Sequence, residues 1–201
     1  MPKIGIVDYG AGNLFSLKCG LERGGAEAQI TEVFSRKNSL DGVILPGVGN
    51  FGSAVRALES YRDELVEAVK AGLPFLGICL GAQLIFERSE EDEGRGLAFL
   101  EGDVLKIPSS VKVPHMGWNN LEIVRNGDFL QGVEEGAWVY FVHSYYPRLK
   151  DETAVAATAD YGVKFPAVVA KGNIFGTQFH PEKSGSVGSR ILNNFIEVCR
   201  R

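Results

Sequence analysis

One short segment constrains the fold more than any other, because it joins an apolar run to a cysteine enclosed by two glycines. The apolar run covers residues 74–78, and the segment that overlaps its end reads Gly77-Ile78-Cys79-Leu80-Gly81. A short apolar run before a sharp turn is typical of a buried strand, and residues 82–87 predict a helix after the turn. Strand, tight turn and helix in this order form the elbow that presents a nucleophile in α/β enzymes. Glycines are required there, because side chains at Gly77 and Gly81 would collide with the strand and the helix. The segment therefore predicts an α/β fold with a reactive Cys79.

Cys79 has two interpretations in this segment. The turn would place its sulfur at the N-terminus of the next helix, where unpaired backbone N–H groups and the helix dipole favour the thiolate. The alternative is a small buried hydrophobe, which is the common role of a free cysteine. The flanking glycines favour the reactive interpretation. Cys19 and Cys199 fall within predicted helices, and Cys199 belongs to the apolar stripe of its helix, so both are predicted to be structural.

A second segment supplies a histidine and a carboxylate close together in the chain. Residues 176–182 read Gly-Thr-Gln-Phe-His-Pro-Glu. Pro181 disfavours helical backbone angles at His180 and predicts an extended segment. Residues two apart in an extended segment face the same side, so the Glu182 carboxylate is expected beside the His180 ring. We infer a triad in which Glu182 orients His180, and His180 manages the proton of Cys79.

Alternating apolar patterns in the first half of the chain predict a parallel, doubly wound sheet. Strands are predicted at residues 3–8, 28–31, 42–45 and 74–78, and helices at residues 13–23 and 53–71. The second half is richer in β-structure, with strands at residues 138–142 and 154–158, a hairpin around residues 171–173, and a closing helix at residues 187–199. The predicted fold class is α/β, with a mostly parallel doubly wound sheet and an added β-rich second half.

Composition limits the functions that the chain can have. Its 201 residues fit one domain spanning positions 1–201, and a 45% share of hydrophobic residues is ordinary for a soluble globular protein. The net charge of −4 argues against non-specific nucleic-acid binding. No apolar run approaches the roughly 18 residues that a membrane span needs. Three widely spaced cysteines suggest neither a disulfide framework nor a zinc site. The first residues predict a strand and not a signal peptide. We therefore expect a cytoplasmic protein without a metal or cofactor.

Two glycine-rich loops follow predicted strands. Gly10-Ala11-Gly12 is not a dinucleotide-binding loop, because Phe15 stands where its third glycine should be. Residues 46–52, which read Pro-Gly-Val-Gly-Asn-Phe-Gly, lie at a predicted carboxyl strand end beside the cysteine turn. This loop is either a donor loop for an oxyanion or a plain strand-to-helix turn. His115 and His143 have no partner at metal-ligand spacing, so a structural role is expected for both.

The segment Gly77-Ile78-Cys79-Leu80-Gly81-x-Gln83, together with His180-Pro181-Glu182, resembles the class I (triad) glutamine amidotransferases over the whole chain. Further segments resemble one branch of that family, the glutaminase subunits of imidazole glycerol phosphate synthase. These segments are Asp8–Asn13, Pro46–Gly49, Pro114–Asn119, Phe141–Tyr145 and His180–Ser184. The resemblance implies that the chain hydrolyses glutamine and passes ammonia to a separate (β/α)8-barrel cyclase. That partner forms imidazole glycerol phosphate on the histidine pathway, and a ribonucleotide that feeds purine synthesis.

The resemblance also implies a role for each matching residue. Cys79, His180 and Glu182 would be the catalytic triad, which acts through a γ-glutamyl thioester. Backbone N–H groups of Leu80 and of the loop at Val48 and Gly49 would bind the oxyanion. The substrate-binding positions would be Gln83, Gly47, Ser144 and Tyr145. The interface with the cyclase would include Asn13, Met116, Trp118, Tyr140 and Lys183, and residues 114–119 are expected to form an exposed loop that presents Met116 and Trp118.

Other functions stay open at this point. The glutaminase subunit of pyridoxal phosphate synthase has a similar size, but residues 46–49 do not match its Gly-Gly-Glu-Ser-type loop. A stand-alone cysteine hydrolase of γ-glutamyl peptides would need no partner. A non-catalytic binding protein on the same fold is disfavoured, because Cys79, His180 and Glu182 are all present.

Overall fold

The computed structural model describes residues 1–10, 12–35 and 39–201. Its main sheet has eight strands in the order β2-β1-β3-β4-β13-β12-β11-β8. The strands from β2 to β13 are parallel, and β12, β11 and β8 continue the sheet in antiparallel pairs. The bounds of these strands are Lys3–Val7 (β1), Glu27–Thr31 (β2), Gly42–Leu45 (β3), Phe75–Ile78 (β4), Glu122–Ile123 (β8), Val155–Asp160 (β11), Lys164–Lys171 (β12) and Ile174–Thr177 (β13). The predicted α/β class with a mostly parallel sheet is confirmed.

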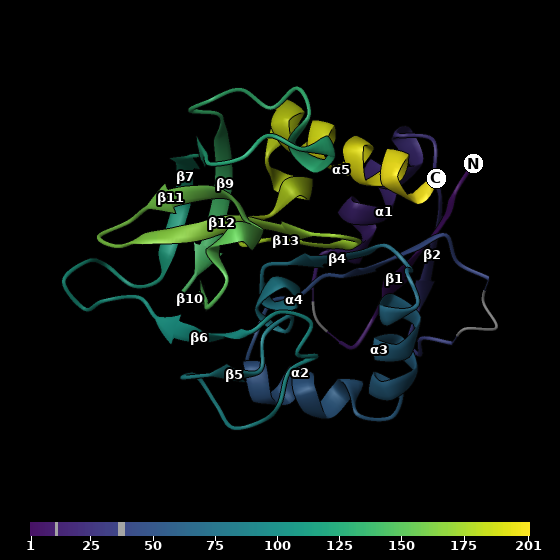
Figure 1. Cartoon of the computed structure of the whole chain (residues 1–201), viewed down its shortest axis with the longest axis horizontal. Coiled ribbons are helices and arrows are strands. Elements are labelled where there is room, and N and C mark those ends of the chain that lie inside the picture. The colour runs from purple at the N-terminus through teal and green to yellow at the C-terminus, as the bar shows by residue number, and fades with distance from the viewer. Residues whose placement is uncertain (11, 36–38) are drawn as a thin grey trace.

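Helices cover both faces of the parallel half of the sheet (Figure 1). The helices are Leu14–Arg23 (α1), Phe51–Leu58 (α2), Arg62–Lys70 (α3), Leu80–Gln83 (α4) and Gly185–Cys199 (α5). Within β3, Ile44 packs in the cluster that includes α1 and α5, whereas Val43 and Leu45 pack in the cluster that includes α2 and α3. This split follows from the alternation of side chains along a strand. The sheet is therefore doubly wound, as the sequence predicted.

The single helix predicted at residues 53–71 is wrong, because the structure has two. α2 ends at Leu58 and α3 begins at Arg62, with Tyr61 between them. The backbone N–H of Tyr61 donates to the carbonyl of Leu58 at 3.1 Å, and the Tyr61 side chain is buried in the core. Both helices bury the same face against the sheet. The apolar stripe therefore continues across a turn that the pattern could not reveal.

The helix predicted at residues 82–87 is also different from the one observed. α4 spans only Leu80–Gln83, and the chain then meets the segment that returns at residues 97–100. Backbone N–H groups of Leu97 and Phe99 donate to the carbonyls of Leu84 and Ile85 at 2.7 and 2.8 Å. Those carbonyls are therefore paired outside the helix, which ends after one turn.

Smaller sheets carry the rest of the β-rich second half. One has the order β10-β6-β5, and the other pairs β7 with β9. Their bounds are Arg88–Ser89 (β5), Gly102–Lys106 (β6), His115–Asn120 (β7), Trp138–His143 (β9) and Tyr145–Leu149 (β10). Short 3-10 helices lie at Asp128–Leu130 (η2), Glu152–Ala154 (η3) and Pro181–Lys183 (η4). The predicted hairpin around residues 171–173 is confirmed, since β12 turns at Gly172 into the antiparallel β13.

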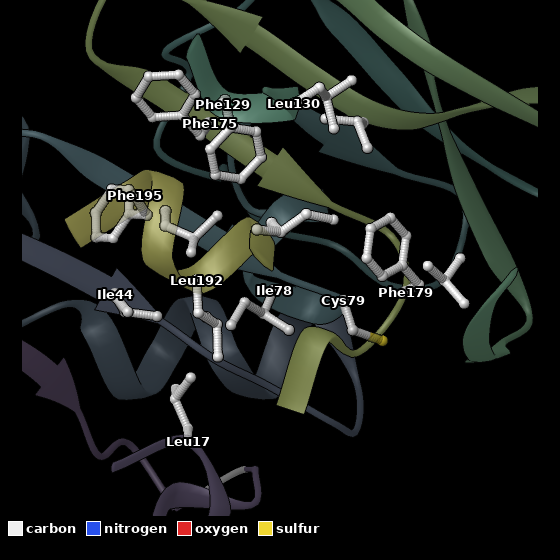
Figure 2. Packing of buried hydrophobic residues seen from close by; sticks show 14 of the residues in the cluster. Leu17, Ile44, Ile78, Cys79, Phe129, Leu130, Phe175, Phe179, Leu192 and Phe195 are labelled. Carbon is white, nitrogen blue, oxygen red and sulfur yellow. The ribbon is translucent and has the colours of Figure 1, made fainter. Parts of the chain in front are cut away.

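Two clusters of buried hydrophobic residues lie on opposite faces of the main sheet. The cluster beneath α1 and α5 includes Leu17, Ile78, Leu192 and Phe195, and Figure 2 shows part of it with Cys79 among its members. Cys199 is buried on the core face of α5, in agreement with its predicted structural role. No helix within the described residues is long and apolar enough to cross a membrane.

Candidate active site

Cys79 lies on a strained turn between β4 and α4. Its backbone has φ 54° and ψ −107°, a combination that non-glycine residues rarely adopt. A Cβ atom on Gly77 would lie 2.4 Å from the carbonyl oxygen of Gly81. A Cβ atom on Gly81 would lie 1.7 Å from the carbonyl oxygen of Leu45 in β3. The collisions expected from the sequence therefore occur with the helix at Gly77 and with a neighbouring strand at Gly81.

The sulfur of Cys79 is almost enclosed, with the residue 5% exposed. The thiol lies 3.6 Å from the carbonyl oxygen of Val142, and Nε2 of Gln178 lies 3.8 Å from the sulfur. α4 is a single turn, so the helix dipole expected to favour the thiolate is short. The groups that act on the sulfur are therefore mainly side chains from distant segments, among them His180.

His180 and Glu182 form a buried pair beside the cysteine turn. Nδ1 of His180 lies 2.9 Å from Oε1 of Glu182, and both side chains are less than 5% exposed. Burial alone lowers the pKa of His180, but the Cys79 sulfur and the Glu182 carboxylate outweigh burial and raise that pKa to about 9. Nε2 of His180, the ring nitrogen that Glu182 does not contact, is buried and has no hydrogen-bond partner among the described residues.

The two side chains meet for a different reason from the one predicted. His180 has φ −99° and ψ 99°, as expected before a proline, but Glu182 lies within the 3-10 helix η4. The backbone of His180 is held on both sides. Its N–H donates to the carbonyl of Tyr140 at 3.0 Å, and the Ser184 hydroxyl donates to its carbonyl at 2.6 Å. The sharp turn after Pro181, and not an extended strand, therefore brings the carboxylate back to the ring.

A cavity of about 280 Å³ opens at Cys79. Its lining contains positions that the sequence identified and others that it did not. The positions identified from the sequence are Cys79, Leu80, Gln83, Val48, Gly49, Ser144 and Tyr145. The additional positions are Glu91, Pro114, Val142 and His143. Gly47, which was predicted to bind substrate, is not among the lining residues, and its carbonyl accepts the backbone N–H of Leu80. The cavity lining therefore combines Cys79 with polar residues, and His180 and Glu182 are not part of that lining.

Glu91 and Gln178 were missed by sequence reasoning. Glu91 stands in an acidic run of four residues, which is the usual pattern of a solvated surface, and it carried no signal of a site. Its carboxylate accepts the backbone N–H of Phe51 at 2.7 Å at the start of α2. Gln178 lies two residues before His180, so the twofold alternation of an extended segment was a usable signal for it.

A polar network joins α4 to the cavity wall. Nε2 of Gln83 donates to the carbonyl of Tyr145 at 2.9 Å and to Oε1 of Gln178 at 3.2 Å. Gln83 and Gln178 are both buried, at 4% and 1% exposure. Because Gln178 also reaches the sulfur of Cys79, this network links the nucleophile to the Ser144-Tyr145 segment.

The loop at residues 46–49 accepts a hydrogen bond from the Leu80 N–H, which is the donor that an oxyanion would need. The backbone N–H of Leu80 donates to the carbonyl of Gly47 at 3.3 Å, so this N–H is already paired. Tyr9 secures the same loop, since its hydroxyl donates to the carbonyl of Pro46 at 2.5 Å. Burial and the neighbouring Cys79 raise the pKa of Tyr9, which keeps that donor protonated. Gly49 has φ 122° and open space around it. In this structure the Leu80 N–H is therefore not free to bind an oxyanion together with an N–H group of the loop.

The loop predicted at residues 114–119 is wrong, because residues 115–119 belong to the strand β7, but the predicted exposure of Met116 and Trp118 is confirmed. Met116 and Trp118 lie on β7 and are 63% and 54% exposed. The Trp118 ring meets the Tyr140 ring of β9 at 5.9 Å, and Nζ of Lys183 lies 5.9 Å from the centre of the same Tyr140 ring. We call Met116, Trp118, Tyr140 and Lys183 the β7–β9 outer face. The β7–β9 pair thus displays Met116, Trp118 and Tyr140, and η4 adds Lys183 over the Tyr140 ring.

Asn13, the last residue of the Asp8–Asn13 segment, is exposed. Its side chain caps α1 by accepting the backbone N–H of Ser16 at 3.3 Å. Ala11, which belongs to the same motif, lies outside the described residues. Among the described residues there is no group of three or more metal-ligating side chains.

Comparisons with known proteins agree with this geometry. Residues 6–199 match the family model described as glutamine amidotransferase class-I. The chain is 46% identical to the imidazole glycerol phosphate synthase subunit HisH of Natronomonas pharaonis, over 96% of this chain and 94% of that one. It is 50% identical to the subunit of the same name from Bacillus cereus, over 97% of this chain and 94% of that one.

Solved structures share the same fold at lower sequence identity. One is a crystal structure of a glutamine amidotransferase, with a TM-score of 0.74, 22% identity, and coverage of 98% of this chain and 99% of that one. Another is PurLQS from Thermotoga maritima, with a TM-score of 0.77, 22% identity, and 98% of each chain covered. The chain therefore belongs to the class I glutamine amidotransferase family, in the branch that includes the HisH subunits of imidazole glycerol phosphate synthase.

Proposed function

We propose that this chain is the glutaminase subunit of imidazole glycerol phosphate synthase, and that residues 1–201 act as one amidotransferase domain. It would hydrolyse glutamine to glutamate and ammonia, and deliver the ammonia to a cyclase partner in histidine biosynthesis. The observation that carries the proposal is the strained turn at Cys79, which lines a cavity of about 280 Å³ and has the His180–Glu182 pair beside it. A location in the cytoplasm, and the absence of any cofactor, remain predictions from the sequence.

The proposed chemistry begins with a charged pair. Because the pKa of His180 is raised to about 9, its ring is protonated at neutral pH when the Cys79 thiolate lies beside it. The thiolate attacks the side-chain amide carbon of glutamine and forms a tetrahedral oxyanion. The protonated ring then gives its proton to the leaving nitrogen, which departs as ammonia. His180 next takes a proton from water, and the resulting hydroxide releases glutamate from the thioester. Glu182 holds the ring through Nδ1 during both steps.

Substrate would bind along the cavity wall. Glutamine carries an ammonium and a carboxylate at its α-carbon, and both need partners away from the sulfur. The Ser144-Tyr145 segment and Gln83 lie along the wall, and Glu91 offers a carboxylate to the ammonium. Gly47 is proposed to act through the loop backbone rather than by lining the cavity.

The oxyanion hole requires a rearrangement of the loop at residues 46–49. The Leu80 N–H is paired with the Gly47 carbonyl here, so it cannot bind an oxyanion until that bond opens. We propose that a shift of the loop frees the Leu80 N–H and turns an N–H from Val48 or Gly49 toward the same point. One oxyanion donor is typically worth about 3 kcal/mol, or a hundredfold or more in rate. The isolated chain is therefore expected to have low activity.

The partner is proposed to be a (β/α)8-barrel cyclase (HisF), in a heterodimer. Exposed aromatic and methionine side chains are typical anchors of an interface. The β7–β9 outer face supplies Trp118 and Met116 with Tyr140 and Lys183 beside them, and Asn13 is proposed as a further contact. A partner seated there would also shield ammonia from water, where it would be protonated and lost.

Glutamate release from glutamine tests this function. The initial rate should be low for the chain alone, and should rise by an order of magnitude or more when the cyclase and its nucleotide substrate are added. Cys79→Ala should remove the activity under both conditions, while the complex still uses free ammonia. Full activity of the lone chain would favour the stand-alone γ-glutamyl hydrolase. Stimulation by a pyridoxal phosphate synthase partner, and none by the cyclase, would favour that other glutaminase.

A further inference from the structure

Two buried histidines connect the β7–β9 sheet to the cavity wall, and the proposed chemistry uses neither. His143 ends β9, is 5% exposed and lines the cavity. His115 begins β7 and is 3% exposed. Nδ1 of His115 lies 3.0 Å from Nε2 of His143, and Nδ1 of His143 lies 2.9 Å from the carbonyl oxygen of Tyr145. The two rings therefore form a bridge between β7 and the substrate-lining segment.

The partners fix which nitrogen of each ring carries the proton. A carbonyl oxygen only accepts, so Nδ1 of His143 must carry the hydrogen, and Nε2 of the neutral ring then has only a lone pair. Nδ1 of His115 must in turn be the donor to that lone pair. Burial lowers the pKa of His115 to about 4 and that of His143 to about 3, so both rings are neutral at physiological pH. Every hydrogen bond in the bridge thus points toward Tyr145.

Asn119 is the first donor of this series of hydrogen bonds, and its orientation agrees with the direction of the series. Its Nδ2 lies 3.4 Å from Nε2 of His115 and donates to the carbonyl of Asp160 at 2.9 Å, while its Oδ1 accepts the backbone N–H of Asn120 at 2.8 Å. The amide orientation is therefore set by its backbone partners, with the N–H side facing His115. The sequence of donors runs from Asn119 through His115 and His143 to the Tyr145 carbonyl.

Aromatic rings hold both imidazoles in place. His115 stacks between Phe141 and Tyr161, with ring centroids at 4.8 and 4.0 Å. His143 meets the Phe165 ring edge-on at 5.1 Å. An apolar side chain would fill such a site without the cost of burying polar nitrogens. What the imidazoles add is a directed N–H, and its target is one carbonyl oxygen.

We propose that His143 and His115 are positioning residues for glutamine binding, acting as a one-directional hydrogen-bond relay that fixes the Tyr145 carbonyl. The inference rests on the proposed glutaminase function. The Tyr145 carbonyl also accepts Gln83, and the neighbouring Ser144 carbonyl accepts the backbone N–H of Ile107 at 2.9 Å. Three hydrogen bonds therefore fix the Ser144-Tyr145 segment, and His143 donates one of them.

Paired substitutions distinguish the relay from a space-filling role. Leucine at position 143 removes the donor, whereas asparagine carries an amide N–H near the position of Nδ1. In the complex with the cyclase, His143→Leu should raise the KM for glutamine about fivefold, the scale of one neutral hydrogen bond, with kcat changed less than about twofold. His143→Asn should restore most of the lost affinity. His115→Leu should have a smaller effect, and His115→Asn a smaller one still.

A double variant and a spectrum complete the test. Because His115 acts through His143, adding His115→Leu to His143→Leu should raise KM no further. The chain has only three histidines, so nitrogen NMR of the imidazoles can read each tautomer. Both His115 and His143 should carry their proton on Nδ1 at neutral pH. The melting temperature of each variant checks that it folds, and the asparagine variants and the spectrum still decide the question if the leucine variants unfold.

Several outcomes overturn the relay. These are an unchanged KM in folded His143→Leu, asparagine variants as impaired as the leucine variants, additive effects in the double variant, or a proton on Nε2 of either ring. If the wild-type complex hydrolyses glutamine and the variants match it, only the relay fails. If the wild-type complex releases no glutamate, the proposed function fails and the relay falls with it.

Discussion

Replacing Gly81 by alanine tests whether the cysteine turn depends on close backbone contact. The added Cβ would lie 1.7 Å from the carbonyl oxygen of Leu45, and real Cβ contacts essentially never fall below 3.0 Å. The chain must therefore open by at least 1.3 Å, the difference between those two distances. The Cβ position is fixed by the backbone of α4 and the oxygen belongs to the backbone of β3, so no side-chain rotation can relieve the contact. The strain must move a strand of the main sheet.

The expected cost follows from that constraint. Overpacking a core typically costs 1–3 kcal/mol, and we expect about 3 kcal/mol at Gly81 because only backbone movement relieves it. For a chain of this size, about 3 kcal/mol corresponds to a melting temperature lowered by about 6–12 °C. The molecules that remain folded should lose most glutaminase activity, because the turn that holds Cys79 is displaced.

Gly127→Ala provides the matched control. Gly127 has φ −169°, which any residue adopts, and no atom lies within 4 Å of the added Cβ. Its unfolding free energy should stay within about 1 kcal/mol of the wild type, with a slight gain if the unfolded chain loses freedom. Thermal and urea unfolding measure both variants. A Gly81→Ala protein that unfolds with the wild-type midpoint would refute the collision argument.

The remaining predictions concern the triad, its titration and the interface. His180→Ala should lower the rate of glutamate release about 100- to 10,000-fold. The rate of Glu182→Gln should fall between that of His180→Ala and that of the wild type, because an amide still contacts the ring but carries no charge. Equal rates for Glu182→Gln and the wild type would show that the carboxylate has no part in the mechanism. The pKa of folded His180 is raised from 6.5 to about 9, so its contribution to stability is full below pH 6.5 and is lost as the pH rises through 9. Urea unfolding across that window should show the loss, and Glu182→Gln should show less of it; an identical pH dependence in both proteins would contradict this origin. Trp118→Ala should weaken binding to the cyclase by about 2 kcal/mol by titration. Val33→Ala, at the same 54% exposure but beyond the far edge strand β2, should leave binding unchanged, and equal effects of the two would argue against an anchor at Trp118.

The cysteine turn could be predicted because its constraints are local. The strand before the turn is a short apolar run, and the collision that requires Gly77 is with Gly81 in the same turn, although the collision at Gly81 is with Leu45 of β3. The proximity of His180 and Glu182 was also predictable from two residues of spacing. The backbone turn that brings these two side chains together was not predictable. It is a 3-10 turn at Pro181 that depends on hydrogen bonds made by Ser184 and Tyr140. The local sequence pattern thus predicted the three residues of the triad but not the turn that brings His180 and Glu182 together.

Other features depend on contacts that no local pattern records. Glu91 reaches the cavity because its segment folds back on the start of α2, although its acidic neighbours suggest a solvated surface. The bond between Leu80 and the Gly47 carbonyl joins segments more than thirty residues apart. Trp118 sits on a strand because β9 pairs with it, and β9 lies beyond Asn120 in the chain. Such long-range pairing decides the wall of the cavity and the state of the oxyanion loop.

The central claim is that Cys79 is the nucleophile that attacks glutamine. The most direct measurement is to treat the complex of this chain and the cyclase with a glutamine-mimicking electrophile, and to map the adduct by peptide mass spectrometry. We expect one adduct per chain, on Cys79, which free glutamine prevents, while Cys19 and Cys199 stay unmodified. An adduct on Cys19 or Cys199, or labelling of Cys79 that glutamine does not slow, would contradict it.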